Sequence, residues 1–227
     1  MTRPMIVFDL DGTLIDTAPD LLDSLNHCLA LAGMEPVAGT ELRRHVGMGG
    51  KVMIERAFAA RRRQLTPDHL AELLEAFLAH YSGNMPGHSV AFPGVESALT
   101  RFRDAGYGLS VCTNKYEDLS VRLLKTLGLA QWFGAICGQD SFAYRKPDPR
   151  HLVSTIEAAG GDPMRALMIG DSETDIKTAK AAGIPVIAVD FGYSDRHVRE
   201  FEPSRVVSHF DEITLEMTES LMKAAAG

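Results

Sequence analysis

The most constraining feature of the sequence is an apolar run that ends in two aspartates, Asp9 and Asp11. Residues 5–8 predict a buried strand, and Gly12 and Thr13 after the second aspartate indicate a turn. Two carboxylates at one strand end repel each other and are costly to bury unless a cation or a proton lies between them. Ligands of open α/β sheets bind at such strand ends. The pattern therefore predicts a metal-dependent site in which one carboxylate attacks and the other transfers a proton.

Two other structures contain a similar pattern: an ordinary Asp-Gly turn and a calcium-binding loop. A calcium loop has glycine at its sixth position and glutamate at its twelfth. Counted from Asp9, these positions hold Leu14 and Asp20. A calcium loop also follows a helix, whereas the residues before Asp9 predict a strand. We therefore favour the catalytic interpretation.

The composition argues against several classes of partner. The chain has 227 residues, a net charge of −7 and no basic stripe, which argues against nucleic acid. No apolar run is long enough to cross a membrane, and no signal peptide is expected. The cysteines are well separated and predict free thiols in a reducing cytoplasm; they are Cys28, Cys112 and Cys137. We expect a cytoplasmic monomer or homodimer that acts on a small molecule.

Strand-like apolar runs recur along the chain, and each is followed by a helical pattern. They lie at residues 5–10, 108–112, 135–137, 166–170 and 186–189. Strands that alternate with helices in this way are typical of an α/β fold. The sequence therefore predicts a parallel sheet with helices on both faces.

The interval between the first and second strands is too long for one crossover connection. Within it, residues 17–86 show only helical patterns, and Thr66 followed by Pro67 predicts the start of a helix. We therefore predict an all-helical cap domain at 17–86, inserted into a core domain made of residues 1–16 and 87–227. The two linkers between the domains would be residues 15–18 and 86–92.

Further polar residues follow the later strands. Thr113 and Asn114 come after the second strand, where a hydroxyl and backbone amides can hold a phosphate. Asp171 ends the fourth strand, and Asp175 lies one helical turn further on and can face the same way. Lys146 lies in the segment between. Each also fits a structural role when taken singly: a helix cap for Thr113 or Asp171, and a surface side chain for Lys146.

The order and spacing of these residues resemble those of the haloacid dehalogenase superfamily, whose members use an aspartate nucleophile. The resemblance covers nearly the whole chain, including a helical cap between the first two motifs. It implies a Rossmann-like core. More narrowly, the chain resembles the bacterial phosphoglycolate phosphatases. The segments that carry this resemblance are residues 8–14, 46–50, 92–95, 113–115, 146–149, 170–175, 179–183 and 191–193.

The resemblance implies a Mg²⁺-dependent phosphatase that forms an aspartyl-phosphate and hydrolyses 2-phosphoglycolate to glycolate and phosphate. Asp9 would be the nucleophile, and Asp11 would act first as general acid and then as general base. The carboxylates of Asp9 and Asp171 and the backbone carbonyl of Asp11 would hold the metal. Asp175 would support the site by holding Lys146 or a metal-bound water.

The resemblance also assigns the binding residues. Thr113, Asn114 and Lys146 would hold the transferring phosphoryl group, so the choice of leaving group would fall to the cap. Because 2-phosphoglycolate carries a second negative charge, basic residues near a glycine-rich loop are candidates to bind its carboxylate. Such residues are often only solvated helix ends. The cap candidates are Arg43, Arg44, His45, Gly47, Met48, Gly49 and Lys51.

Related activities can be weighed with the same residues. Asp11 argues against a dehalogenase, whose halide leaving group needs no proton. It also argues against a phosphonate hydrolase with a cap lysine, although Lys51 could supply that lysine. A phosphatase of pyrophosphate or of a sugar phosphate stays open, as does a sugar-phosphate mutase. A non-catalytic phosphate- or metal-binding module would be expected to lack one of these residues, and none is missing.

Overall fold

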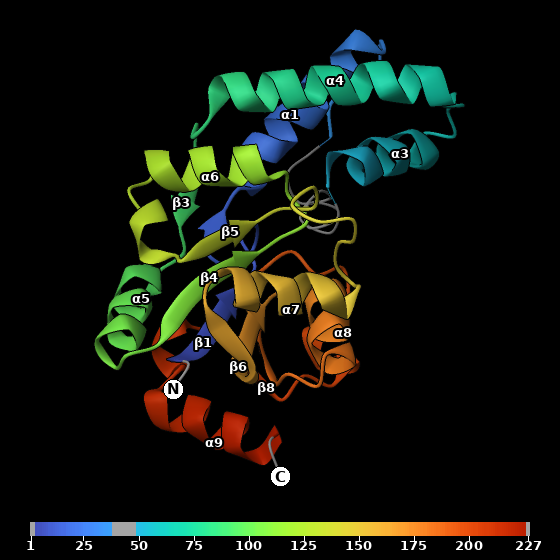
Figure 1. The fold of residues 1–227 in the computed structure, drawn as a ribbon. Helices are drawn as coiled ribbons and strands as arrows, with labels where there is room; N and C mark the ends of the chain where they lie inside the picture. Colours follow the sequence, from blue (N-terminus) through green and yellow to red (C-terminus); the bar gives the residue numbers. More distant parts are fainter. Residues whose placement is uncertain (1–2, 38–48, 226–227) are drawn as a thin grey trace.

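The structure is a computed structural model that describes residues 3–37 and 49–225 (Figure 1). Its main sheet is parallel and six-stranded, in the order β5-β4-β1-β6-β7-β8. The strands are β1 (Arg3–Phe8), β4 (Gly108–Cys112), β5 (Ala135–Cys137), β6 (Gly161–Gly170), β7 (Val186–Val189) and β8 (Arg205–Val207). The predicted parallel sheet is confirmed. The edge strand β8 was not predicted.

Helices cover both faces of this sheet, as predicted (Figure 1). Successive side chains of a strand point to opposite faces, so the buried residues of β1 divide between two apolar clusters. Met5 and Val7 pack with α7 (Pro149–Ala158) and α8 (Glu173–Ala181). Ile6 and Phe8 pack on the opposite face with residues of three other helices. These are α5 (Val95–Asp104), α6 (Glu117–Thr126) and α9 (Leu215–Ala225).

Among the described residues, three helices form a separate part at one end of the molecule (Figure 1). They are α1 (Ala18–Leu31), α3 (Gly50–Ala60) and α4 (Pro67–Asn84). They enclose an apolar cluster that includes Leu25, Phe58 and Phe77, to which Tyr193 from outside these helices also belongs. The hydroxyl of Thr66 accepts a hydrogen bond from the N–H of His69 and caps α4. The domain boundaries at residues 17 and 86 stay a prediction, which is supported by the packing of these helices mainly against one another.

The helical part joins the sheet through two short strands. β2 (Ile15–Asp16) and β3 (Val90–Ala91) pair in antiparallel fashion, within the segments where the sequence predicts the two linkers. Asp20, in the first turn of α1, fastens the returning linker. Its carboxylate accepts hydrogen bonds from the N–H groups of His88 (2.7 Å) and Ser89 (2.9 Å) and from the Ser89 hydroxyl. No pattern in the sequence indicated a role for Asp20.

Replacing Asp20 by alanine is expected to lower the free energy of unfolding by about 2–4 kcal/mol, because two N–H groups and a hydroxyl lose their acceptor. Urea denaturation of the purified protein measures this change. Asp23→Ala is the matched control, since Asp23 is exposed on the same helix; its change should stay within about 0.5 kcal/mol. Equal effects of the two substitutions would contradict the linker role of Asp20.

Two compositional predictions can be compared with the structure. Cys28, Cys112 and Cys137 are buried and free, as predicted. In the ranges 3–37 and 49–225, no helix combines the length and the apolar content that crossing a lipid bilayer requires.

Candidate active site

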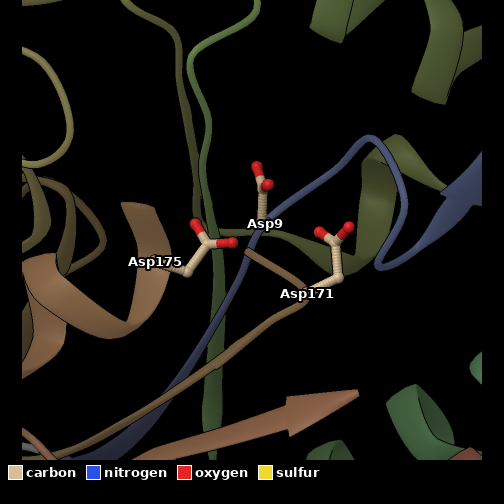
Figure 2. A group of neighbouring side chains, drawn as sticks. All are labelled: Asp9, Asp171 and Asp175. Atoms are coloured by element: carbon tan, nitrogen blue, oxygen red, sulfur yellow. The ribbon is translucent and has the colours of Figure 1, made fainter. Parts of the chain in front are cut away.

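Three buried carboxylates converge at the carboxyl edge of the parallel sheet (Figure 2). Asp9 directly follows β1, Asp171 directly follows β6, and Asp175 lies in the first turn of α8. The strands β1 and β6 are neighbours, and the N–H of Asp9 donates to the carbonyl of Ile169 at 2.9 Å. One oxygen of each carboxylate lies within 4.8 Å of the others. The structure therefore brings Asp9 to Asp171 and Asp175, which follow it in the sequence by 162 and 166 positions.

Asp171 is held by hydrogen bonds to both of its oxygens. The hydroxyl of Thr13 donates to Oδ1 at 2.9 Å, and the backbone N–H of Tyr193 donates to Oδ2 at 2.7 Å. Gly12 lies against this carboxylate with φ +82°, and a Cβ atom at Gly12 would collide with it. Only glycine fits there. Tyr193 lies in a segment of the family resemblance, but no pattern in the sequence indicated a role for it.

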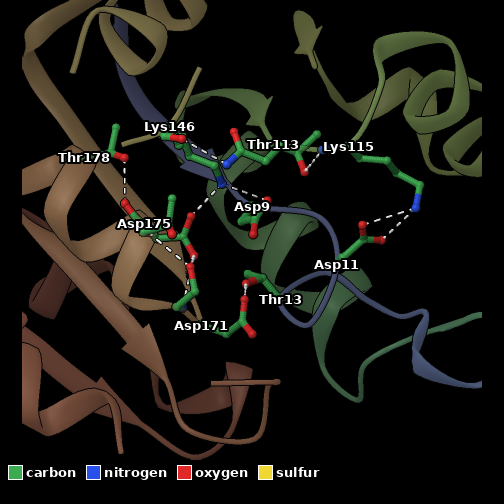
Figure 3. A network of polar contacts seen from close by, with 12 residues as sticks. Asp9, Asp11, Thr13, Thr113, Lys115, Lys146, Asp171, Asp175 and Thr178 are labelled. Atoms are coloured by element: carbon green, nitrogen blue, oxygen red, sulfur yellow. Dashed lines mark hydrogen bonds and ion pairs between the residues drawn. The ribbon is translucent and has the colours of Figure 1, made fainter. Parts of the chain in front are cut away.

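Lys146 is the positive charge of this cluster (Figure 3). Its Nζ lies 2.9 Å from Asp9 Oδ1 and 2.5 Å from Asp175 Oδ1. The side chain is only 3% exposed, so Lys146 is not a surface lysine. Its backbone N–H donates to Nδ1 of His151, and its carbonyl accepts from Nδ2 of Asn114. Burial disfavours the ammonium, but the Asp175 and Asp9 carboxylates outweigh this effect and raise the pKa of Lys146.

Thr113 and Asn114 follow β4, which lies next to β1 in a register that pairs Phe8 with Val111. Thr113 and Asp9 therefore leave the sheet at neighbouring positions. The Thr113 hydroxyl oxygen accepts a hydrogen bond from the N–H of Lys115 at 3.2 Å. The Asn114 side chain holds the carbonyl of Lys146, a contact that the sequence did not indicate. Phosphate binding by Thr113 and Asn114 stays a prediction.

The repulsion among the three buried carboxylates favours the binding of a cation. Burial and the Asp175 carboxylate raise the pKa of Asp9 to about 6, although Lys146 opposes this shift. Burial, followed by Asp175 and Asp9, raises the pKa of Asp171 well above its ordinary value. A divalent cation would relieve this repulsion, and carboxylate oxygens are the hard ligands that Mg²⁺ prefers. The residues present therefore fit a magnesium ion.

Asp11 points away from the three carboxylates although it is only two residues from Asp9 (Figure 3). The Thr17 hydroxyl donates to its Oδ1 at 2.8 Å. The Nζ of Lys115 lies 3.1 Å from Oδ1 and 3.2 Å from Oδ2. Lys115 lies in residues 113–115, a segment of the family resemblance, but no pattern in the sequence indicates that it pairs with Asp11.

Most of the cap candidates cannot be placed relative to this site. Arg43, Arg44, His45, Gly47 and Met48 lie outside the described residues. Gly49 precedes α3 and has φ +84°, a conformation that favours glycine. Lys51 is exposed and lines a hollow between α3 and α4, where none of the clustered carboxylates is found. Substrate binding by these residues stays a prediction.

Known proteins share this architecture over nearly the whole chain. Residues 6–189 match the family described as haloacid dehalogenase-like hydrolase. A phosphoglycolate phosphatase of Mesorhizobium japonicum is 64% identical over 225 residues, which cover 99% of each chain. One of Agrobacterium fabrum is 48% identical over 98% of this chain and 96% of its own.

Solved structures agree with this similarity. The crystal structure of a predicted phosphoglycolate phosphatase from Haemophilus somnus has a TM-score of 0.87 and 28% identity, and the match covers 96% of this chain and 99% of that one. The structure of CbbY from Rhodobacter sphaeroides in complex with phosphate has a TM-score of 0.79 and 26% identity, over 96% of this chain and 100% of that one. These similarities extend over the sheet and the helical part alike.

Proposed function

The chain belongs to the haloacid dehalogenase-like hydrolase family and is a phosphatase, and we propose that it hydrolyses 2-phosphoglycolate through an aspartyl-phosphate on Asp9. The observation that carries the chemistry is the meeting of Asp9, Asp171 and Asp175 with Lys146 at one edge of the sheet. The choice of substrate is supported by two relatives named phosphoglycolate phosphatase, which are 64% and 48% identical to this chain. We also propose that the enzyme works in the cytoplasm, as a monomer or a homodimer.

Asp9 is the nucleophile of the proposed reaction. Mg²⁺ held by the carboxylates of Asp9 and Asp171 and the backbone carbonyl of Asp11 would offset the repulsion between the nucleophile and a phosphate dianion. Lys146 adds a positive charge beside Asp9, and Asp175 fixes the position of that charge through its ion pair. Lys146 and the Thr113 hydroxyl then bind the transferring phosphoryl group.

Asp11 transfers the protons. It protonates the leaving oxygen of glycolate when Asp9 attacks phosphorus. It then takes a proton from the water that hydrolyses the aspartyl-phosphate, which frees Asp9 and returns Asp11 to the protonated form that it had when Asp9 attacked. Closure of the helical part over the sheet edge excludes bulk water from the intermediate.

A panel of kcat/KM values measured with Mg²⁺ tests the proposed substrate. The panel contains 2-phosphoglycolate, pyrophosphate, hexose phosphates and nucleoside monophosphates. We expect the highest value for 2-phosphoglycolate. A higher value for pyrophosphate or a hexose phosphate would overturn the substrate and leave the phosphatase chemistry intact. Transfer of phosphate within a hexose phosphate, without release of phosphate, would show a mutase instead.

The affinity for Mg²⁺ is expected to fall as the pH falls below about 6, because the pKa of Asp9 is raised to about 6 in the metal-free protein. Above this pH Asp9 is ionised and free to bind the metal. Below it, a proton must be released, which weakens binding about tenfold per pH unit. The pKa of Asp171 is also raised, chiefly by burial, so a proton on Asp171 adds to this competition.

Isothermal titration of the metal-free enzyme with Mg²⁺ between pH 5 and pH 8 measures this dependence. Asp9→Asn is the matched variant, because it removes the proton that competes at residue 9 and should make the pH dependence shallower. Equal affinities at pH 5 and pH 7 in the wild type would contradict the predicted competition.

A further inference from the structure

Lys115 is a buried lysine that the proposed mechanism does not use. It lies just before α6 and is 9% exposed. Its Nζ contacts both oxygens of Asp11 and lies 4.2 Å from the centre of the Tyr81 ring on α4. Burial disfavours the ammonium, but Asp11 and Tyr81 outweigh this effect and raise the pKa of Lys115. Lys115 is therefore a fixed positive charge where the sheet edge meets the helical part.

The ion pair holds Asp11 in a position that does not suit a general acid. Both carboxylate oxygens face Lys115, and the Thr17 hydroxyl also donates to one of them. Figure 3 shows this pair set apart from Asp9 and Lys146. Both oxygens of a carboxylate held in this way accept hydrogen bonds from neighbouring groups, whereas a general acid has to donate a proton to the leaving oxygen. Asp11 therefore has to leave Lys115 before it can protonate the leaving group.

The departure of Asp11 leaves a buried ammonium without its anion, which is strongly unfavourable. Among the described residues, Asp11 supplies the carboxylate that forms an ion pair with Lys115. A substrate with a negative charge besides its phosphate could neutralise the Lys115 ammonium in place of Asp11. In 2-phosphoglycolate a single methylene carbon separates the carboxylate from the ester oxygen. A carboxylate bound to Lys115 would therefore place the ester oxygen beside Asp11.

We propose that Lys115 determines specificity by binding the carboxylate of the substrate, which replaces Asp11 in the ion pair and frees Asp11 to protonate the ester oxygen. This inference rests on the proposed function and extends it to the phosphate esters of small hydroxy acids. It assigns to the core domain the carboxylate contact that the sequence assigned to Arg44 or Lys51 in the cap.

The protons balance over the cycle. Asp11 takes a proton from solvent when it leaves Lys115 and gives that proton to the oxygen of the leaving alcohol. It takes a second proton from the water that cleaves the aspartyl-phosphate. It releases this proton to solvent when it pairs again with Lys115 after the product carboxylate departs.

The test compares the wild type with Lys115→Met on two substrates, 2-phosphoglycolate and its neutral amide, phosphoglycolamide. The loss of one charge-assisted contact should lower kcat/KM for 2-phosphoglycolate about tenfold to a hundredfold. For phosphoglycolamide, which cannot replace Asp11 in the ion pair, the same substitution should not lower kcat/KM. Equal losses on the two substrates would overturn the proposal and leave Lys115 as a residue that only positions Asp11 or stabilises the fold. No loss on either would also overturn it.

Three controls complete the experiment. Lys125→Met removes an exposed positive charge from α6 and should alter neither substrate. Lys115→Arg keeps the charge and should retain part of the preference for 2-phosphoglycolate. If Lys115→Met does not fold, inhibition of the wild type decides: glycolate should compete more tightly than glycolamide, and equal inhibition would overturn the proposal.

The same measurements separate this inference from the proposed substrate. A wild type that prefers a phosphate ester without a carboxylate in the substrate panel would contradict the proposed function. The role of Lys115 is judged by how Lys115→Met changes the ratio of the kcat/KM values for 2-phosphoglycolate and phosphoglycolamide. This ratio is measured independently of the preference of the wild type.

Discussion

Replacement of Asp9 by asparagine is expected to reduce turnover by at least about 10⁴-fold, because an amide is a poor nucleophile and a poorer metal ligand than a carboxylate. The amide cannot form the acyl-phosphate, so rapid acid quenching and mass spectrometry should find no phosphorylated protein. The wild type quenched during turnover should carry one phosphoryl group on the peptide that contains Asp9.

Asp118→Asn provides the matched control, because Asp118 is an exposed aspartate on α6. It should turn over at the wild-type rate. Thermal unfolding of Asp9→Asn checks that the fold is intact. Substantial activity in a folded Asp9→Asn protein would exclude Asp9 as the nucleophile, and the mechanism would then need another attacking group.

Replacement of Asp11 by asparagine is expected to have an effect that depends on the leaving group. With 2-phosphoglycolate, kcat/KM should fall about 10²–10⁴-fold, because an alkoxide leaves poorly without a proton. With p-nitrophenyl phosphate the loss should be less than about tenfold in the step that forms the aspartyl-phosphate, since nitrophenolate leaves unprotonated. Burst kinetics separate this step from the hydrolysis of the intermediate.

The comparison of two substrates is needed because Asp11→Asn also removes the anionic partner of Lys115. A loss of stability lowers the activity on both substrates alike, whereas the loss of a general acid does not. Comparable losses in the first step on both substrates would therefore remove Asp11 from the role of acid. The residue would then serve to neutralise Lys115.

Much of the proposed active site could be predicted because its members follow strands. Asp9, Asp171 and Thr113 each come directly after an apolar run, and the runs belong to adjacent parallel strands. The carboxyl ends of such strands meet at one edge of the sheet, so local patterns and one topological rule are enough to bring these residues together. Lys146 could be proposed only through the family resemblance, because an isolated lysine is usually exposed.

The hydrogen bonds around the junction between the sheet and the helical part could not be predicted from the sequence. Asp20 binds the linker at Ser89, and the hydroxyl of Tyr193 donates to Asp16 at 2.5 Å while its backbone N–H holds Asp171. The partners lie 69, 177 and 22 positions apart. Each of these residues is an ordinary polar residue in the sequence, and its role arises only when folding buries it beside a particular partner.

Asp9 and Asp11 show which features can be predicted from the sequence and which depend on the tertiary structure. The sequence by itself determined that Asp9 and Asp11 stand at the end of a buried strand and need positive charge. After β1 the chain turns, and the N–H groups of Leu14 and Ile15 both bond to the Leu10 carbonyl. Only the tertiary structure decided that Asp9 faces Lys146 and that Asp11 faces Lys115. This turn sends two carboxylates that are neighbours in the sequence toward positive charges from different elements, and burial makes each of those pairings strong.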